Sequence, residues 1–456
     1  MTLDEWAALA GEPVDELLHW NRLGLVPVEG ESDAEQFERA RLIRFALNRG
    51  YTAEKLAEIT TRHGDLIGPF AKAAATRTGG PVCAVEEAAA GADIDPTVFE
   101  RLRKAAGLGD QHQAYAEDVE AIRLMKTALD AGLDADVLAQ MFRLFADATA
   151  KMADGAVRLF HFYVHEQLRA AGSLQGAELL AMTNLISERM VPLEEPAVVY
   201  FHHKGRERAW AEDMMLHLAE EATTPSEVPG EFTRAFLFVD LSSFTPMTEA
   251  MGDAAAARVV ERFSELVRDG AARCSGQVVK QIGDEFMLVF ADGRSAATFG
   301  LTMQQMARAE RRFPALRLGA HVGSVLFREG DYLGTAVNTA ARVAGAATRH
   351  QFLVTDAVRG QLGDLDVEVV AVGARALKGL GEPVELFELR RRHPVAIRVV
   401  DPVCGMELDE ESAEAELSSQ ARRLLFCSQQ CLRRFLDDPG RYQAALSDGD
   451  GRPVGP

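Results

Sequence analysis

Residues 236–245, FLFVDLSSFT, and residues 278–290, VVKQIGDEFMLVF, decide the fold of this chain. Both contain runs of Val, Ile, Phe and Leu, which are typical of buried strands. Asp240 lies at the end of the first run, and Asp284 lies at the tip of the second. We expect the two carboxylates to lie side by side at one edge of a sheet. Carboxylate oxygens suit hard cations such as Mg²⁺ and Mn²⁺, so the two runs predict a divalent cation site.

A third stretch, residues 331–342, reads DYLGTAVNTAAR. Asn338 and Arg342 are four residues apart and share one face of a helix. They supply an amide and a permanent positive charge, which are groups that stabilise a phosphorus centre under attack. A single Asp after a strand is more often a turn residue or a helix cap. The whole set, in this order, indicates chemistry on a nucleotide phosphate.

Strand and helix patterns alternate between residues 234 and 389. We expect strands at 235–241, 276–281, 285–291 and 316–325, and helices at 253–272, 294–313 and 336–347. This order predicts an α/β sandwich with a ferredoxin-like β-α-β-β-α-β core.

On these motifs, residues 233–389 resemble the catalytic domain of class III nucleotidyl cyclases. The resemblance covers about a third of the chain. It implies two Mg²⁺ or Mn²⁺ ions per active site and a role for each of eight residues: metal binding by Asp240, Asp284 and the backbone carbonyl of Leu241, base recognition by Lys280 and Asp331, transition-state stabilisation by Asn338 and Arg342, and phosphate contact by Lys378.

The pair at the base positions resembles an adenine reader, because the Lys280 ammonium donates to ring N1 and the Asp331 carboxylate accepts from N6. The resemblance therefore implies an adenylate cyclase that forms cyclic AMP and pyrophosphate from ATP. In that family the site lies between two catalytic domains. One domain with a full residue set implies a homodimer, in which Asp240 and Asp284 face Asn338 and Arg342 of the other copy. The IGDEF segment also resembles the signature of diguanylate cyclases, but Ile282 replaces a glycine of that signature.

Composition narrows the possible functions. The chain has 456 residues, enough for three or four domains, and 47% of them are hydrophobic. Its net charge of −20 argues against broad nucleic-acid binding, which needs basic patches. No apolar run approaches the roughly 20 residues that span a bilayer, and the N-terminus carries no signal segment. We expect a cytoplasmic protein without membrane contact.

The first 220 residues or so have helical character and contain an internal repeat. Residues 41–59 align with residues 123–141, an offset of about 82 residues. Residues 3–27 resemble the start of a MerR-type helix-turn-helix, but the segment in the recognition position is acidic, which argues against DNA binding. The longer arrangement resembles the inhibitory helical region of certain actinobacterial adenylate cyclases.

The region before the catalytic segment also concentrates histidines, namely His161, His165, His202, His203 and His217. A titrating cluster near a connecting helix would make activity depend on pH. A histidine on a helix is more often simply packed or solvated. Residues 221–232, EATTPSEVPGEF, read as a hinge.

The end of the chain changes character. Residues 401–409, DPVCGMELD, and residues 425–442, which begin LFCSQQC, resemble the YHS domain, a short metal-associated module. The thiolates of Cys404, Cys427 and Cys431 suit Zn²⁺ or another thiophilic ion. Three ligands leave a tetrahedral site incomplete, so an inert or redox-active thiol cluster is the alternative.

These patterns predict a multidomain protein with an all-α regulatory region, an α/β catalytic domain and a small cysteine-containing module. The expected boundaries are 1–80 and 81–201 for the helical repeats, 202–230 for a connecting helix and hinge, 231–392 for the cyclase domain and 398–446 for the YHS-like domain. The leading hypothesis is an adenylate cyclase regulated by its N-terminal helices. The alternative is a metal- or nucleotide-responsive helix-turn-helix regulator with a catalytically silent cyclase domain.

Overall fold

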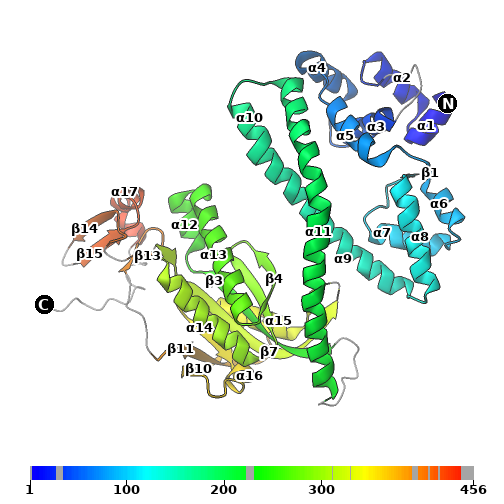
Figure 1. The fold of residues 1–456 in the computed structure, drawn as a ribbon. Helices are drawn as coiled ribbons and strands as arrows, with labels where there is room; N and C mark the ends of the chain where they lie inside the picture. Colours follow the sequence, from blue (N-terminus) through cyan, green and yellow to red (C-terminus); the bar gives the residue numbers. More distant parts are fainter. Residues whose placement is uncertain are drawn as a thin grey trace. The chain divides into compact units, whose positions relative to one another are not determined.

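The computed structural model describes residues 3–26, 34–221, 231–310, 312–328, 330–392, 399–408, 411–419 and 422–442. The chain divides into two compact units, residues 1–224 and residues 225–456, which are described separately (Figure 1). Residues 222–230, most of the expected hinge, lie outside the described residues, as do the last residues of the expected YHS-like domain. Within the described ranges, no helix is both long enough and apolar enough to cross a membrane.

The N-terminal unit contains two sets of helices related by a constant offset. The first set is α1 (Leu3–Ala10), α2 (Val14–Arg22), α3 (Ala34–Leu47) and α4 (Ala53–His63), which is followed by α5 (Gly68–Thr78). The second is α6 (Val85–Gly91), α7 (Pro96–Ala105), α8 (Ala116–Asp130) and α9 (Ala135–Phe160). Each helix of the second set begins 82 residues after its counterpart, as Leu3 and Val85 or Ala53 and Ala135 show.

The same offset relates caps, turns and core positions of the two sets. Thr52 caps α4 and Asp134 caps α9, each by accepting a backbone N–H of the first helical turn. The glycines that follow α3 and α8, Gly50 and Gly132, both have a φ of 91°. Buried residues also correspond: Ala7 with Ala89, Leu17 with Phe99, Trp20 with Leu102, and Ala40 with Ile122.

A long helical hairpin ends this unit. Helix α9 continues through a π-helical turn, η1 (His161–His165), into α10 (Glu166–Ala170), and α11 (Gly176–Glu221) then runs for 46 residues. The connecting helix expected from residue 202 is therefore the last part of a helix that begins at Gly176. Pro192 and Pro196 lie inside α11, which continues although each proline removes an N–H donor.

The second unit is built on an eight-stranded sheet with β3 (Glu231–Leu241) at its centre. The strand order is β10-β11-β9-β7-β3-β5-β4, and β8 pairs with β7. The other strands are β4 (Gln277–Ile282), β5 (Glu285–Phe290), β7 (Leu316–Arg328), β8 (Asp331–Leu333), β9 (Phe352–Thr355), β10 (Glu368–Arg375) and β11 (Val384–Arg390). The expected strands and their order are confirmed, and β3 begins four residues earlier than expected.

Helices cover both faces of this sheet, which explains why β3 is apolar at each position from Ala235 to Val239. Alternate residues Leu237 and Val239 join the core under α13 (Asp253–Arg273) and α14 (Gly293–Ala309). The residues between them, Phe236 and Phe238, join a second core under α15 (Thr335–Ala346). Two short helices, α12 (Phe244–Met251) and α16 (Asp356–Arg359), complete the set.

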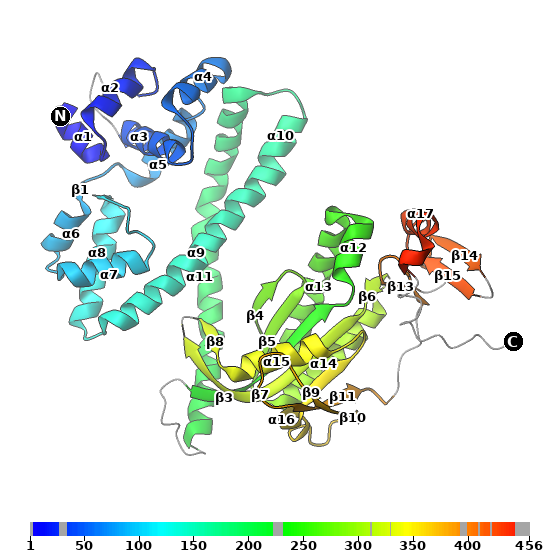
Figure 2. The ribbon, with the colours of Figure 1, turned by 180° about the vertical axis from the view of Figure 1, so that it is seen from behind.

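The C-terminal module is small and packs directly on the domain built around the eight-stranded sheet. It contains β12 (Val399–Val400), β13 (Met406–Leu408), β14 (Ala415–Ser419), β15 (Arg422–Phe426), α17 (Gln429–Asp437) and the 3-10 turn η2 (Pro439–Tyr442). Strand β13 pairs with β6 (Phe313–Pro314), a short strand that precedes β7 (Figure 2). A three-stranded sheet therefore contains strands from both the module and the larger domain.

Candidate active site and cysteine cluster

Asp240 and Asp284 lie together at one end of the central strands. Asp240 is the penultimate residue of β3, and Asp284 lies in the turn between β4 and β5, where Gly283 has a φ of 63°. The Asp240 carboxyl group lies close enough to Asp284 to raise the pKa of Asp284. Asp240 is 6% exposed, and its Oδ1 is buried without a hydrogen-bond partner in the described structure. A buried, unsatisfied carboxylate oxygen beside a second carboxyl group fits a hard divalent cation.

The electrostatics of this pair also suit a cation. Burial and the neighbouring carboxyl of Asp240 raise the pKa of Asp284 to about 7. Burial and the charge of Asp240 likewise raise the pKa of Glu285. Negative charge is therefore costly here unless a cation or proton offsets it.

Arg317 is a site residue that the sequence analysis missed. It stands opposite Asp240 in the β3–β7 pairing, and its Nε donates to Asp240 Oδ2 at 2.7 Å. Its Nη2 also donates to the same oxygen. The guanidinium thus partly neutralises Asp240 in the absence of a cation. Only the strand register reveals this contact, because 77 residues separate the partners.

The two expected base-contacting residues meet as well. Lys280 on β4 donates from Nζ to Asp331 Oδ2 on β8 at 2.6 Å, and each side chain is 40% exposed. The pair is open enough to exchange this mutual contact for a ligand. Asp331 also accepts the backbone N–H of Tyr332, which fixes one of its carboxylate oxygens.

Asn338 and Arg342 lie on the exposed face of α15, opposite the small residues that pack on the sheet. Within the described structure neither side chain makes a hydrogen bond or ion pair, and no interaction joins them to Asp240 or Asp284. Lys378, in the turn between β10 and β11, is also exposed. Leu241, whose carbonyl was the expected third metal ligand, is buried at the end of β3. Within one copy of the chain, Asn338 and Arg342 therefore do not contact the Asp240–Asp284 site.

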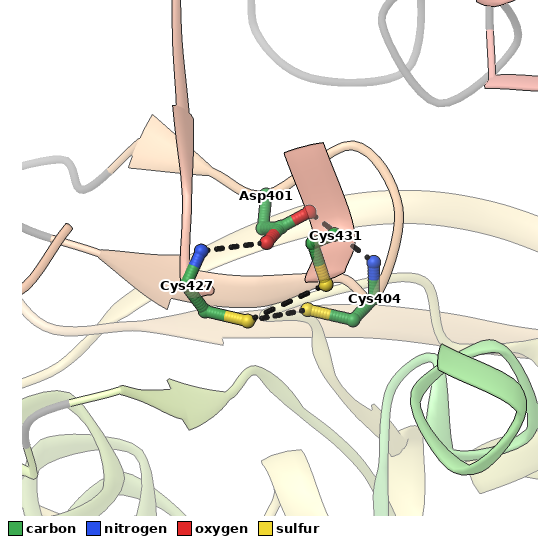
Figure 3. Close-up of side chains that lie close together, drawn as sticks. All are labelled: Asp401, Cys404, Cys427 and Cys431. Carbon is green, nitrogen blue, oxygen red and sulfur yellow. Dashed lines mark hydrogen bonds between the residues drawn. The ribbon is translucent and has the colours of Figure 1, made fainter. Parts of the chain in front are cut away.

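The C-terminal module contains a second cluster, formed by Asp401, Cys404, Cys427 and Cys431. Their ligand atoms all lie within 4.8 Å of one another and all four residues are buried. The Sγ atoms of Cys404 and Cys427 are 3.4 Å apart, and those of Cys427 and Cys431 are 3.6 Å apart (Figure 3). Asp401 supplies the fourth group that the three cysteines lacked, and three sulfurs with one oxygen can complete a tetrahedral zinc site.

Hydrogen bonds hold this cluster in place. Asp401 Oδ1 accepts the backbone N–H of Val403 at 2.8 Å, and Oδ2 accepts that of Cys427 at 2.8 Å. Hydrogen bonds from Cys404 and Cys427 hold the pKa of Cys431 well below its ordinary value, while the hydrogen bond with Cys427 raises the pKa of Cys404. Three sulfurs and a carboxylate held this close together are an arrangement that a thiophilic cation would stabilise.

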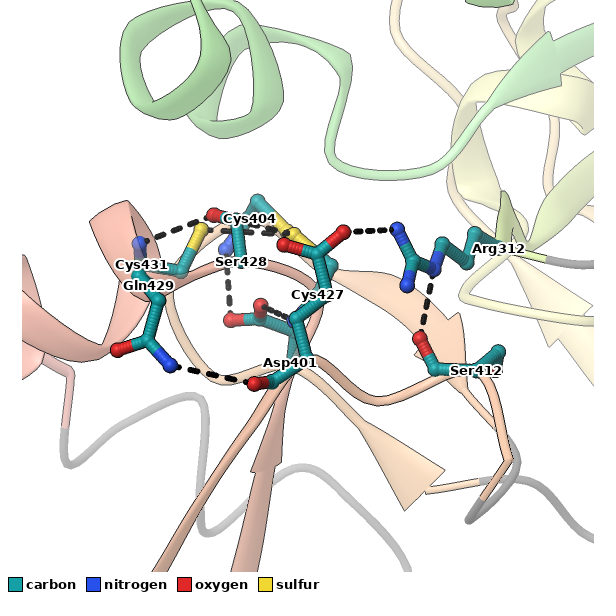
Figure 4. Close-up of polar contacts among 9 residues, drawn as sticks. Arg312, Asp401, Cys404, Ser412, Cys427, Ser428, Gln429 and Cys431 are labelled. Carbon is teal, nitrogen blue, oxygen red and sulfur yellow. Dashed lines mark hydrogen bonds and ion pairs between the residues drawn. The ribbon is translucent and has the colours of Figure 1, made fainter.

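The loop of residues 412–414, next to the cluster, is hydrogen-bonded to the domain built around the eight-stranded sheet. Arg312, next to β6, donates from Nε to the carbonyl of Ser412 at 2.6 Å and pairs with Glu414 at 2.7 Å (Figure 4). The Gln429 amide at the start of α17 donates to the Glu414 carbonyl at 3.2 Å. The loop that faces the cluster therefore bridges α17 and the catalytic domain.

Comparison with known families identifies the same two regions. Residues 233–390 match the family described as the adenylate and guanylate cyclase catalytic domain, and residues 399–445 match the YHS domain. A pH-sensitive adenylate cyclase of Mycobacterium tuberculosis is 26% identical over 380 residues, covering 78% of this chain and 88% of that protein. An adenylate cyclase of Streptomyces coelicolor is 28% identical over 280 residues, covering 60% of this chain and 70% of that protein.

Among solved structures, an adenylyl cyclase from P. aeruginosa is similar with a TM-score of 0.32 and 21% identity. The similarity covers 36% of this chain and 99% of that one.

Proposed function

We propose that the protein converts ATP to 3′,5′-cyclic AMP and pyrophosphate, because residues 233–390 match the adenylate and guanylate cyclase catalytic domain family. The buried Asp240 carboxylate, with one oxygen left without a partner beside Asp284, carries the proposal. Relatives named adenylate cyclase support the choice of substrate.

The Lys280–Asp331 pair supports adenine as the base. Adenine presents an acceptor at N1 and a donor at N6, so an ammonium and a carboxylate complement it. Guanine presents the opposite pattern at these two positions. The pair is preformed at 2.6 Å and partly exposed. When ATP binds, the single contact between Lys280 and Asp331 would be replaced by two contacts, one with adenine N1 and one with N6.

The carboxylates of Asp240 and Asp284 would hold two Mg²⁺ or Mn²⁺ ions, with the Leu241 carbonyl as a further ligand. When bound, the ions would lower the pKa of the ribose 3′-hydroxyl and neutralise the triphosphate. The Arg317 guanidinium would be released from Asp240 and would then lie beside the anionic substrate. Asn338 and Arg342 would bond the oxygens at the α-phosphorus as charge develops there.

A homodimer would complete the site. Asn338 and Arg342 are exposed on α15 and have no interaction with Asp240 or Asp284 in one copy. A second copy that presents its α15 to these carboxylates would place all the groups in one site, and two-fold symmetry would generate two such sites.

Mixing two inactive variants tests both the chemistry and the dimer. Asp240→Asn and Arg342→Ala should each abolish cyclic AMP formation from ATP and Mn²⁺ in the full-length protein. Mixed dimers would contain one intact site, so an equimolar mixture should recover about a quarter of wild-type activity. Recovery no greater than either variant alone would exclude a shared site. ATP binding without product in the wild-type protein would instead favour a nucleotide-binding regulator.

We also propose that the N-terminal helices regulate the cyclase and that pH is one of the signals. His161 and His165 stack with ring centroids 4.9 Å apart in η1, and His165 Nδ1 lies 3.2 Å from Thr183 Oγ1 on α11. Protonation of either ring would place a charge in this contact. The name of the mycobacterial relative, a pH-sensitive adenylate cyclase, supports the same signal.

The cluster of Asp401 and three cysteines is the proposed site of a thiophilic cation, with Zn²⁺ as the reference ion. Its preformed geometry and burial support this assignment over an inert thiol group.

A further inference from the structure

The cysteine cluster and the catalytic domain share one hydrophobic core. Met247 and Ala250 of α12 are buried in the same cluster of side chains as Cys404, Cys427 and Phe435. Helix α12 begins at Phe244, four residues after Asp240. The sulfurs are therefore packed against the segment that immediately follows a proposed metal ligand of the active site.

Gly405 of the module lies against Ser243 of the loop that follows β3. A Cβ added at Gly405 would lie 2.6 Å from the Cβ of Ser243 and 2.9 Å from its Oγ, so only a glycine fits at this spacing. Ser243 itself has a φ of 68°, a left-handed conformation that is uncommon for residues other than glycine. Gly405 follows the ligand Cys404 directly, and Ser243 lies three residues after Asp240. The Gly405 backbone thus packs on the Ser243 side chain, and each residue lies close in sequence to one of the two candidate metal sites.

A second contact reaches the segment after α15. Arg349 donates from Nη2 to the Gly405 carbonyl at 2.9 Å and pairs with Glu407 at 3.1 Å. His350 also pairs with Glu407, whose side chain is only 6% exposed. These residues follow α15, which carries Asn338 and Arg342. Residues next to Cys404 therefore touch the ends of both elements that carry the proposed catalytic groups.

A third connection runs through the shared sheet. Glu407 of β13 pairs with Phe313, and Met406 pairs with Pro314, in the strand that leads into β7. The next residue, Ala315, accepts the backbone N–H of Ser242 at 2.8 Å. Strand β7 then presents Arg317 to Asp240, so the module supports both partners of that ion pair.

We propose that binding of a thiophilic cation to Asp401, Cys404, Cys427 and Cys431 is coupled, through the contact of Gly405 with Ser243, to binding of the catalytic divalent cation at Asp240 and Asp284. The module is then an internal metal sensor that sets how readily the cyclase takes up Mg²⁺ or Mn²⁺. This inference rests on the proposed function of the Asp240 site.

The sulfur spacing gives the direction of the effect. Sulfurs bound to zinc at about 2.3 Å in a tetrahedron would lie about 3.8 Å apart, close to the 3.4 and 3.6 Å of the existing cluster. A bound ion would therefore fix Cys404 and Gly405 nearly where they are. This would hold the Ser243 turn and the end of β3 in the arrangement that presents Asp240. Since such coupling is reciprocal, each cation should favour the other.

The test uses the full-length protein, stripped of metal and kept under reductant. The number of Zn²⁺ ions bound per chain is measured. Cd²⁺ is added in a parallel experiment, because its bonds to thiolates give a charge-transfer absorption. Mn²⁺ affinity is measured from the loss of the free Mn²⁺ EPR signal, which needs no turnover. One equivalent of Zn²⁺ should tighten Mn²⁺ binding at least threefold and lower the Mn²⁺ concentration needed for half-maximal cyclase activity to the same extent.

Three variants separate binding from coupling. C404S/C427S/C431S should lose the absorption and the Zn²⁺ effect. Gly405→Ala should keep the thiolate absorption but lose the coupling, because its Cβ would displace Ser243. Gly373→Ala is the matched control: Gly373 also has a positive φ, 87°, but a Cβ there meets no atom within 4 Å, so it should couple as wild type does.

Each alternative result is informative. An equal Zn²⁺ effect in the triple cysteine variant would mean that Zn²⁺ acts at the Asp240 site, and it would overturn the proposal. Unchanged Mn²⁺ affinity after one equivalent of Zn²⁺ has bound to the thiolates would overturn it as well. Absence of cyclic nucleotide, with the coupling of Mn²⁺ to Zn²⁺ intact, would contradict only the proposed catalytic function.

Discussion

Arg317 and Asp240 face each other across the β3–β7 strand pair, with the guanidinium on one carboxylate oxygen and the other oxygen buried without a partner. Arg317 thus occupies part of the space around Asp240 in which a divalent cation would bind. Cation and guanidinium are alternative partners for the same charge.

Replacing this arginine tests that exchange. Arg317→Gln should lower the free energy of unfolding of the metal-free protein by about 1–3 kcal/mol, because it leaves Asp240 buried without a charged partner. Added Mg²⁺ should raise the melting temperature of the variant more than that of the wild-type protein. Equal stabilisation of the two proteins by Mg²⁺ would contradict the exchange.

The pKa of Asp284 predicts a dependence of stability on pH. Because its folded pKa is raised to about 7, the folded protein holds this proton more tightly than the unfolded chain does. The melting temperature of the metal-free protein should therefore fall as the pH rises from about 4 to about 7.

Asp284→Asn should remove this contribution, so the variant should be the more stable protein at pH 8 while losing cyclase activity at least about 100-fold. Asp147→Asn is the control, since Asp147 is exposed on α9. An Asp284→Asn melting curve with the wild-type pH dependence would assign that dependence to another group.

Reversing the charges of the base-contacting pair should change the substrate. Lys280→Glu combined with Asp331→Lys keeps an ion pair but exchanges donor and acceptor, which complements guanine. The ratio of kcat/KM for ATP to that for GTP should fall by at least about 100-fold, because each mismatched base leaves polar groups unpaired. Each single variant should lose activity toward ATP without gaining activity toward GTP. An unchanged ratio in the double variant would remove these residues from base recognition.

The histidine stack should make the N-terminal unit sensitive to acid. Burial, and then the charge of His161, lower the pKa of His165, while Glu166 opposes and Arg169 reinforces the shift. The unfolded chain therefore binds this proton more readily, and stability should fall as the pH drops below about 6.5.

Hydrogen exchange of α10 and α11 at pH 7.5 and pH 5.5 measures this effect. Protection factors, which are exchange rates corrected for the intrinsic pH dependence of amide exchange, should be lower at pH 5.5 than at pH 7.5. This loss of protection should disappear in His165→Gln and persist in His112→Gln, whose histidine is exposed in the same unit. The same protection factors at both pH values in the wild-type protein would rule out His165 as an acid-sensitive contact.

Local patterns were sufficient to predict the catalytic sheet and the meeting of Asp240 with Asp284, because each carboxylate follows directly from a buried apolar run. They were insufficient for Arg317, whose role depends on the register between strands far apart in sequence. Asp401 lies within the quoted DPVCGM motif, yet only the fold brings its carboxylate to three cysteines. The start of α11 was missed because its helix continues through two prolines, which local pattern reading associates with helix ends.

The shared core of α12 and the C-terminal module bears on how this protein can be divided. Cutting the chain after residue 390, where the match to the cyclase family ends, would expose Met247 and Ala250 to water and leave the edge of β6 without its neighbour. His350 would lose Glu407, its acidic partner in the module. A truncated catalytic fragment would therefore have an altered surface, with buried side chains exposed to water. Low activity of such a fragment would reflect the loss of these contacts and not the activity of the intact domain.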